Sequence, residues 1–141
     1  MSEPIVVDAS VIVDSLVGAA RAPAVRAHLA GRTLHAPAHL DAEVLSALGR
    51  LQRAEDLQVE AVQERLERLA GAPIERHPLA DLLVGAWARL DSMRLVDALY
   101  VELAERLGAG LLTTDVRLAR AYAGATALSG RGSQPSSRPS R

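Results

Sequence analysis

Short strand-like runs alternate with helical patterns along this chain, and that alternation restricts the folds open to it. Strands are predicted at residues 4–8, 33–36, 73–77, 110–114 and 125–128. Helices are predicted at residues 11–17, 22–30, 40–53, 79–90 and 95–107, with another between Asp56 and Gly71 and a short one from Val116. Strands that alternate with helices are typical of βαβ units, in which the strands are parallel. The pattern therefore predicts an α/β fold with a parallel β-sheet.

Two of the predicted helices carry a clear apolar face and recognisable ends. One face of residues 40–53 holds four aliphatic side chains at helical spacing: Leu40, Val44, Leu48 and Leu51. Asp56 is predicted to cap the next helix, and Gly71 follows its end. Both helices should therefore pack one side against a core.

Composition excludes several kinds of chemistry. The chain has 141 residues, 49% of them apolar, which suits one domain with a hydrophobic core. It contains no Cys, which excludes disulfides, thiolate metal sites and cysteine nucleophiles. It contains no Lys, which excludes a P-loop, a Schiff base and the lysine-dependent site of receiver domains. Because Phe is also absent, the core must consist mainly of Leu, Val, Ile and Ala.

Residues 129–141 differ in composition from the rest of the chain. They contain only Ser, Gly, Arg, Gln and Pro, which offer no apolar surface to bury, so we predict a disordered tail. The tail has three Arg and no acid, whereas residues 1–128 have 13 Arg, 17 acids and a net charge of −4. A basic tail can contact nucleic acid, but a solvated chain end is the simpler interpretation. Residues 1–128 are predicted to form one folded domain.

No segment resembles a targeting or membrane sequence. The first residues lack a basic stretch, and Asp8 and Asp14 interrupt their apolar runs. The longest other apolar stretch, residues 82–88, is far below the roughly 20 residues that span a bilayer. We therefore expect a cytoplasmic protein without a membrane segment.

Four acidic residues occupy positions where chemistry is expected. Asp8 ends the first predicted strand and Asp115 follows the strand at 110–114. Ligand sites of open parallel sheets lie at these carboxyl ends. Glu43 and Asp97 lie within amphipathic helices, beside apolar residues that would desolvate them. Simpler interpretations stay open: Asp8 and Asp115 as helix N-caps or turn residues, and Asp97 as a helix cap or the partner of Arg94.

The four acids have a common consequence if the fold brings them together. Their mutual repulsion must then be offset by protons or cations. An all-oxygen pocket without Cys or clustered His suits Mg²⁺ or Mn²⁺ rather than zinc. A metal in such a pocket lowers the pKa of a bound water, offsets phosphate charge and stabilises the leaving oxygen. Convergence of the acids would therefore favour phosphodiester hydrolysis, although periodicity alone does not place them together.

Four segments, in this order, resemble those of PIN-domain proteins and, in detail, the VapC toxins of bacterial toxin–antitoxin pairs. They are residues 6–10 with Asp8, 41–48 with Glu43, 97–104 with Asp97, and 111–118 with Asp115. The resemblance covers residues 4 to 128. It implies a parallel sheet with helices on both faces, in three layers (α/β/α), and metal-dependent endoribonuclease activity. It also implies an RNA substrate, a small cognate antitoxin and a homodimer.

The resemblance assigns catalysis and the binding of Mg²⁺ or Mn²⁺ to four acids: Asp8, Glu43, Asp97 and Asp115. Ser10 and Thr113 would support them through contacts to metal, water or a neighbouring carboxylate. Alternatives stay open for both, since Ser10 can cap the following helix and Thr113 can be an ordinary strand residue. Asp41 competes for the second acid position but fits better near the helix N-terminus. Asp14 and Glu102 are expected to face solvent.

Other side chains near these motifs are candidates for binding roles. Arg94 and Arg117 could contact RNA phosphates, with ion pairing and a solvated helix face as the alternatives. Trp87 and Tyr100 are expected in core or dimer packing, and the apolar stripe at 82–90 is wide enough for core plus a partner interface. The net charge of −4 speaks against broad affinity for nucleic acid.

Two other functions are weighed against the nuclease. One is a PIN-like module that binds RNA or protein without catalysis. The other is a small-molecule phosphatase, because residues 8–11 resemble the start of the haloacid-dehalogenase signature. Ser10 replaces the second Asp of that signature, and its lysine has no candidate here. The four His show no metal-ligand spacing, and Pro37 between His35 and His39 speaks against a shared metal.

Overall fold

The structure, a computed structural model, describes residues 2–128. The predicted tail at 129–141 lies outside the described residues. Five parallel strands form one sheet in the order β3-β2-β1-β4-β5. The strands are β1 (Pro4–Val7), β2 (Thr33–Pro37), β3 (Ile74–His77), β4 (Gly110–Thr113) and β5 (Ala125–Ala127). The predicted α/β class is confirmed.

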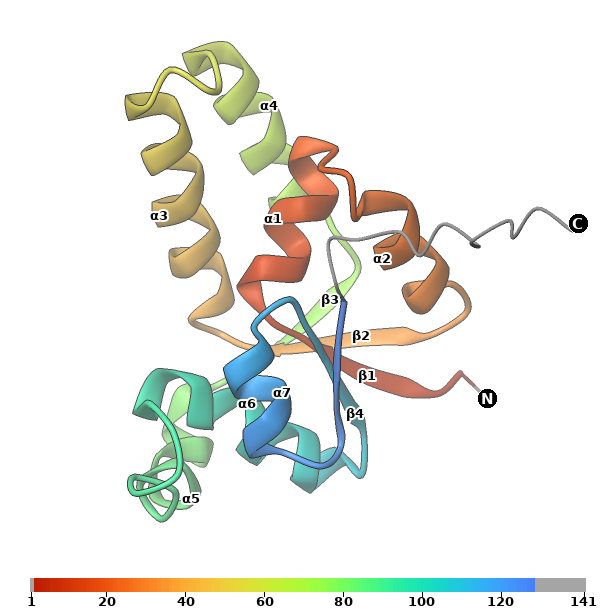
Figure 1. Cartoon of the computed structure of the whole chain (residues 1–141), viewed down its shortest axis with the longest axis vertical. Coiled ribbons are helices and arrows are strands. Elements are labelled where there is room, and N and C mark those ends of the chain that lie inside the picture. Colours follow the sequence, from red (N-terminus) through yellow and green to blue (C-terminus); the bar gives the residue numbers. More distant parts are fainter. Residues whose placement is uncertain (1, 129–141) are drawn as a thin grey trace, which may run out of the picture.

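Helices cover both faces of the sheet, as Figure 1 shows. Above it in that view lie α1 (Ala9–Val17), α2 (Ala22–Leu29), α3 (Leu40–Arg53) and α4 (Val59–Ala70). Below it lie α5 (Leu83–Trp87), which follows the 3₁₀ turn η1 (Leu79–Leu82), and α6 (Leu95–Leu107). The short helix α7 (Val116–Ala121) packs against β4 and β5. This arrangement confirms the three layers.

The connections of the sheet reverse direction between β1 and β4. From β1 the chain continues to β2 and β3 on one side, and then returns to β4 on the other side of β1. Val7 is in register with Leu112, and the Asp8 backbone N–H donates to the Leu112 carbonyl at 3.2 Å. Such a reversal leaves a crevice at the carboxyl ends of the two strands, where ligands bind in open α/β sheets. Asp8 and the segment after β4 lie at this crevice.

Aliphatic side chains form the core, as the absence of Phe predicted. Tyr100 joins them at 1% exposure, whereas Trp87 on α5 is 61% exposed. Tyr100 is therefore a core residue, whereas Trp87 is not, and its packing in a dimer stays a prediction. Within residues 2–128, no helix has both the length and the apolar composition needed to cross a bilayer.

The predicted helix at 79–90 is divided into η1 and α5. Leu82 and Ala86, four residues apart, both face the core on either side of this division. At Gly85 the chain approaches α6 so closely that a Cβ atom would lie 2.1 Å from Cδ of Glu102. A larger residue at this position would displace the Glu102 side chain from its contacts with Arg89 and Arg106, and sequence periodicity gives no sign of this approach.

The start of α4 also differs from expectation. The helix begins at Val59 with Gln58 at the cap position, so the prediction that Asp56 caps it is wrong. The backbone N–H of Asp56 donates instead to the Leu51 carbonyl at 2.9 Å. Asp56 therefore belongs to the turn that ends α3. Helix α6, by contrast, ends at residue 107 as predicted, and the Gly108 that caps it adopts the left-handed conformation with φ of 59°.

Candidate active site

Asp8 lies at the carboxyl end of β1, where hydrogen bonds fix its carboxylate. It is the N-cap of α1, and its Oδ1 accepts from the Val11 backbone N–H at 3.2 Å. Ser10 Oγ donates to the same oxygen at 2.5 Å, and Thr113 Oγ1 donates to Oδ2. The interpretation of Asp8 as a helix cap is thus correct, but two hydroxyl groups hold it beyond what capping requires.

The same two hydroxyl groups tie Asp8 to the segment that carries Asp115. Ser10 Oγ accepts from the Thr114 backbone N–H at 3.2 Å, and Thr113 Oγ1 accepts from the Asp115 backbone N–H at 2.9 Å. Ser10 lies inside α1, so its alternative role as the N-cap is wrong. Thr113 is fully buried at the end of β4 and contacts both acidic segments. Thr113 is therefore not only a strand residue, because its hydroxyl joins the Asp8 carboxylate to the Asp115 backbone.

Burial makes the charge of Asp8 costly. The residue is 7% exposed, and this desolvation raises its pKa against the opposing effect of the hydrogen bonds from Ser10 and Thr113. The negative charge of Glu43 raises the pKa further. A buried carboxylate beside a second carboxylate is stabilised by a proton or a cation.

Glu43 projects from the first turn of α3 and is held by two side chains that the sequence did not assign to the site. Tyr100 Oη donates to Glu43 Oε1 at 2.6 Å, and His39 Nε2 lies 3.1 Å from the same oxygen. Partial burial alone would raise the pKa of Glu43. The hydrogen bonds from His39 and Tyr100, with the positive charge of Arg94, outweigh burial and lower this pKa below its usual value. Glu43 therefore stays ionised.

The spacing of these two side chains is a signal that could have revealed them. His39 precedes Glu43 by four residues, and Tyr100 follows Asp97 by three. Helical residues three or four apart share a face, so each could have been placed beside an acid. The sequence predicted packing for Tyr100, which is correct for its buried ring. It did not predict that the hydroxyl donates to Glu43.

Asp97 and Asp115 line one pocket of about 260 Å³, together with Arg94 and Arg117. Asp115 is the N-cap of α7, and its Oδ1 accepts from the Arg117 backbone N–H at 2.9 Å. Asp97 lies in the first turn of α6, and its Oδ2 accepts from Arg94 Nε at 3.1 Å. The cap interpretation of Asp115 and the ion-pair interpretation of Asp97 are therefore correct, whereas Asp97 does not cap α6, because Arg94 holds that position. Both contacts leave the carboxylates at the pocket.

The four acids form two pairs around Arg94. Glu43 is near Asp8, whereas Asp97 and Asp115 share a pocket. Among residues 2–128, no three of these carboxylates bring oxygens within 4.8 Å of one another. The hydrogen bond to Asp97, and the charges of Asp97, Asp115 and Glu43, raise the pKa of Arg94. The pair that shares the pocket, Asp97 and Asp115, offers oxygen donors only, and oxygen donors suit a hard divalent ion.

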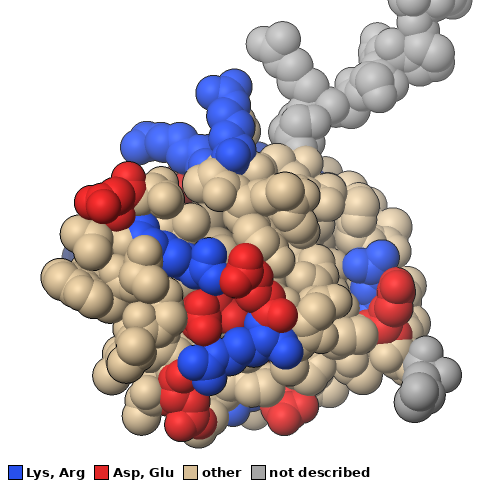
Figure 2. Space-filling model, turned by 90° about the horizontal axis from the view of Figure 1, so that it is seen from below, with Lys and Arg blue, Asp and Glu red and all other residues tan. Residues whose placement is uncertain are grey.

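The three acids predicted to lie outside the site do so, and each has a basic partner. Asp41 forms a two-point contact with Arg76 at 3.0 and 3.2 Å, and Asp14 pairs with Arg21 at 2.8 Å. The side chains of Glu102 and Asp14 are only 13% and 15% exposed and contact arginines, so the expectation that both face solvent is wrong. Figure 2, viewed from the side of α5 and α6, shows acidic and basic side chains interleaved on that face.

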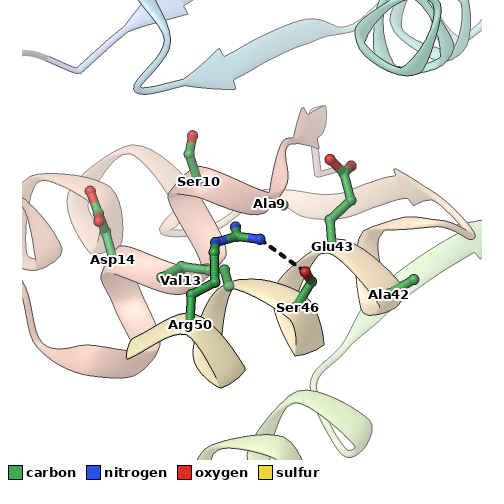
Figure 3. Close-up of a pocket in the computed structure, with 9 residues that line it drawn as sticks. Ala9, Ser10, Val13, Asp14, Ala42, Glu43, Ser46 and Arg50 are labelled. Atoms are coloured by element: carbon green, nitrogen blue, oxygen red, sulfur yellow. Dashed lines mark hydrogen bonds between the residues drawn. The ribbon is translucent and has the colours of Figure 1, made fainter. Parts of the chain in front are cut away.

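A second pocket, of about 550 Å³, lies between α1 and α3 on the Glu43 side (Figure 3). Ser10 and Glu43 point to the same side of this pocket. Arg50 bends toward α1 and donates from Nη1 to Ser46 Oγ at 2.9 Å. Within residues 2–128, no salt bridge involves Arg50. The pocket thus offers a guanidinium and hydroxyl groups next to Glu43.

Comparison with known proteins gives consistent matches. The PIN domain family matches residues 5–124. Ribonuclease VapC3 of Mycobacterium tuberculosis is 59% identical over 127 residues, which are 89% of this chain and 93% of that protein. Ribonuclease VapC12 of the same organism is 36% identical over 121 residues, covering 84% and 92%. VapC ribonuclease Mb0985 of Mycobacterium bovis is 33% identical over 114 residues, covering 81% and 87%.

A solved structure agrees with the fold. The crystal structure of PAE2754 from Pyrobaculum aerophilum superposes with a TM-score of 0.64 at 24% identity. The match covers 87% of this chain and 82% of that chain. At this identity the likeness concerns the fold.

Proposed function

The chain belongs to the PIN-domain family, and from that premise we propose that it is a metal-dependent endoribonuclease, the toxin of a VapBC-type toxin–antitoxin pair. The observation that carries the proposal is the match to ribonuclease VapC3 over nearly the full length of both proteins. The site geometry supports it, because Asp8 follows β1 beside Glu43 of α3, and Asp115 after β4 shares a pocket with Asp97 of α6.

The proposal assigns the divalent ion, Mg²⁺ or Mn²⁺, to four acids: Asp8, Glu43, Asp97 and Asp115. When bound, such an ion polarises an attacking water and offsets the charge of the scissile phosphate. The oxygen-only donor set and the attraction of Arg94 to three of the acids support this assignment.

The residues of the chain prepare the site in two ways. Ser10 and Thr113 fix the orientation of the Asp8 carboxylate, and its burial favours a bound cation over a solvated charge. Tyr100 and His39 hold Glu43 as an ionised hydrogen-bond acceptor. In this arrangement Glu43 can orient a water or take a proton from it.

Arginines on both sides of the acids are proposed to bind the RNA strand. Arg94 and Arg117 line the pocket of Asp97, and Arg50 lines the pocket of Glu43. Guanidinium groups suit phosphate oxygens in geometry and charge. Phosphate contacts confined to the site also agree with the net charge of −4 on residues 1–128.

Two protein partners are proposed. One is a small cognate antitoxin in the cytoplasm, where the RNA substrate also is. The other is a second copy of the chain, because an apolar patch lies uncovered on α5 and α6. We define this α5–α6 patch by Leu83, Val84, Trp87, Leu95, Val96 and Leu99. Val84 is 84% exposed, and a two-fold dimer would bury the patch against its own copy.

Incubation of the purified protein with total cellular RNA tests the proposed function. Reactions contain Mg²⁺, Mn²⁺ or EDTA, and fragment patterns are read on gels. We expect discrete fragments with either metal and none with EDTA. Folded protein that is separated from antitoxin and yields no fragments under any condition would instead favour the non-catalytic binding module.

We expect Tyr100→Phe to lower kcat by about 10- to 100-fold, the range typical for loss of a side chain that orients a metal ligand. The ring keeps its place in the core while Glu43 Oε1 loses its 2.6 Å hydrogen bond. Steady-state cleavage of a short RNA measures the effect, with Tyr122→Phe as the matched control. Equal kcat values for the two variants would show that the Tyr100 hydroxyl has no role in cleavage.

We expect Arg50→Ala to raise KM by about fivefold with little change in kcat, as for one exposed phosphate contact. The dependence of log affinity on log salt concentration should also fall by about one unit. Arg26→Ala, an exposed arginine on α2, removes the same charge away from the site and is the control. A KM and salt dependence equal to those of the control would show that RNA does not contact this pocket.

A further inference from the structure

Two histidines and a glutamate converge on the face of the sheet opposite α1. His35 of β2 is in register with Glu75 of β3, and His77 follows Glu75 by two residues. Side chains alternate along a strand, so these three project from the same face. Leu34, the neighbour of His35, lines a pocket with residues of α1 and α4. The three side chains therefore project to the opposite face, where α6 packs.

Their distances suit a common metal ion. His35 Nδ1 lies 3.0 Å from His77 Nε2 and 3.4 Å from Glu75 Oε2. Among residues 2–128 these three form the group of metal-binding side chains whose ligand atoms all lie within 4.8 Å of one another. In a tetrahedral zinc site, with Zn–N near 2.0–2.1 Å, neighbouring ligand atoms are about 3.3 Å apart. The distances of 3.0 and 3.4 Å from His35 Nδ1 lie on either side of this ligand–ligand separation.

Hydrogen bonds orient the ring of His35 so that Nδ1, the nitrogen that would bind the metal ion, faces His77 and Glu75. Its Nε2 lies 3.3 Å from Thr33 Oγ1, so a proton on Nε2 can be donated to that hydroxyl. Nδ1 then accepts from the Nε2–H of His77 at 3.0 Å, and a metal ion that binds both nitrogens would take the place of this shared proton. A polar contact on the second ring nitrogen is also typical of metal-binding histidines, because it fixes the tautomer.

The surroundings allow an ion to enter. The His35 side chain is 12% exposed and is held by the sheet, whereas Glu75 is 66% exposed on an edge strand. His35 and Glu75 also line a surface pocket of about 570 Å³. The site thus combines a fixed imidazole with a carboxylate that can close from solvent.

We propose that His35, His77 and Glu75 form a second metal site, selective for a zinc-class transition-metal ion. Two imidazole nitrogens and one carboxylate suit Zn²⁺, Co²⁺ or Ni²⁺ and do not suit Mg²⁺, which prefers oxygen donors. The bound ion joins β2 to β3 across the edge of the sheet. It binds the folded chain and therefore stabilises it. The proposal is independent of the ribonuclease activity.

Zinc titration of the full chain in the Asp97→Asn background tests the site, because this background weakens binding at the four acids. Chelator-treated protein is titrated with Zn²⁺ by calorimetry at slightly alkaline pH, where imidazoles bind metal without competition from protons. We expect one equivalent of Zn²⁺ to bind and the unfolding temperature to rise by about 5 °C or more. Titration with Co²⁺ should give the visible absorption of a tetrahedral ion.

Three further variants in the same background decide the outcome. His77→Ala should weaken Zn²⁺ binding by at least about 100-fold, and Glu75→Gln by about tenfold, with loss of the Co²⁺ spectrum. His28→Ala removes an exposed histidine elsewhere and should bind as the parent does. Glu75 is exposed, so its variant keeps the test valid if His77→Ala fails to fold. Parent protein that binds no Zn²⁺, or a Glu75→Gln protein that binds and absorbs as the His28→Ala protein does, would overturn the proposal.

Discussion

An Asp97→Asn protein is expected to stay folded and to lose RNA cleavage by at least about 10³-fold. A metal ion contributes several kcal/mol to stabilising charge in the transition state, and each 1.4 kcal/mol or so is tenfold in rate. The substitution replaces a carboxylate oxygen by an amide at the pocket shared with Asp115. Cleavage rates of one short RNA by wild type and variant, with Mg²⁺ and with Mn²⁺, measure the loss.

The fold should tolerate this change. The contact that Asp97 loses is an ion pair with the largely exposed Arg94, and exposed pairs add little to stability. Asp91→Asn is the matched control, because it removes one carboxylate from an exposed position six residues earlier. Circular dichroism and thermal unfolding should not separate the two variants. An Asp97→Asn protein that cleaves at the control rate contradicts the assignment, and one that does not fold shows a structural role.

Val84→Glu is expected to convert a dimer into a monomer. In the proposed dimer the α5–α6 patch is buried against its copy, so the substitution places two unpaired carboxylates in an apolar interface. The dimer dissociation constant should rise by at least about 100-fold, because each 1.4 kcal/mol or so is tenfold in affinity. Sedimentation velocity over a range of protein concentrations measures this shift.

The control for that substitution is Val59→Glu. Val59 is 60% exposed at the start of α4, on the other side of the sheet from the patch. This variant should sediment as the wild type does. If Val84→Glu remains dimeric, the interface lies elsewhere. If the wild type is a monomer, a second copy does not cover the patch, and binding to the antitoxin becomes the next measurement.

Part of the candidate site could be predicted because its positions follow from local rules. Asp8 and Asp115 each follow a strand, and parallel strands end at the same edge of a sheet. Their simpler interpretation as helix caps is also correct. Each of these carboxylates lies between a strand end and a helix start, so it can be both a helix cap and an active-site residue. The local sequence pattern therefore could not distinguish the two roles.

The contact of Tyr100 with Glu43, unlike the local contact of His39 with Glu43, could not be predicted in the same way. Tyr100 lies 57 residues from Glu43, and the two helices that carry them lie on opposite faces of the sheet (Figure 1), yet its hydroxyl donates to Glu43. The rotation of each helix about its axis decides whether the hydroxyl reaches the carboxylate. Periodicity shows which face of α6 is apolar, but it does not show which residue of another helix lies opposite.

The sequence by itself determined the α/β class, most element boundaries and the strand-end positions of two acids, because repeating backbone geometry sets these within a few residues. Only the tertiary structure decided the strand order, the pairing of the acids around Arg94 and the meeting of His35 with His77 across 42 residues. The spacing of histidines along the chain gave no metal-binding pattern. Ligands from two strands come together through the register of the sheet, which depends on how the whole core packs rather than on any local run of residues.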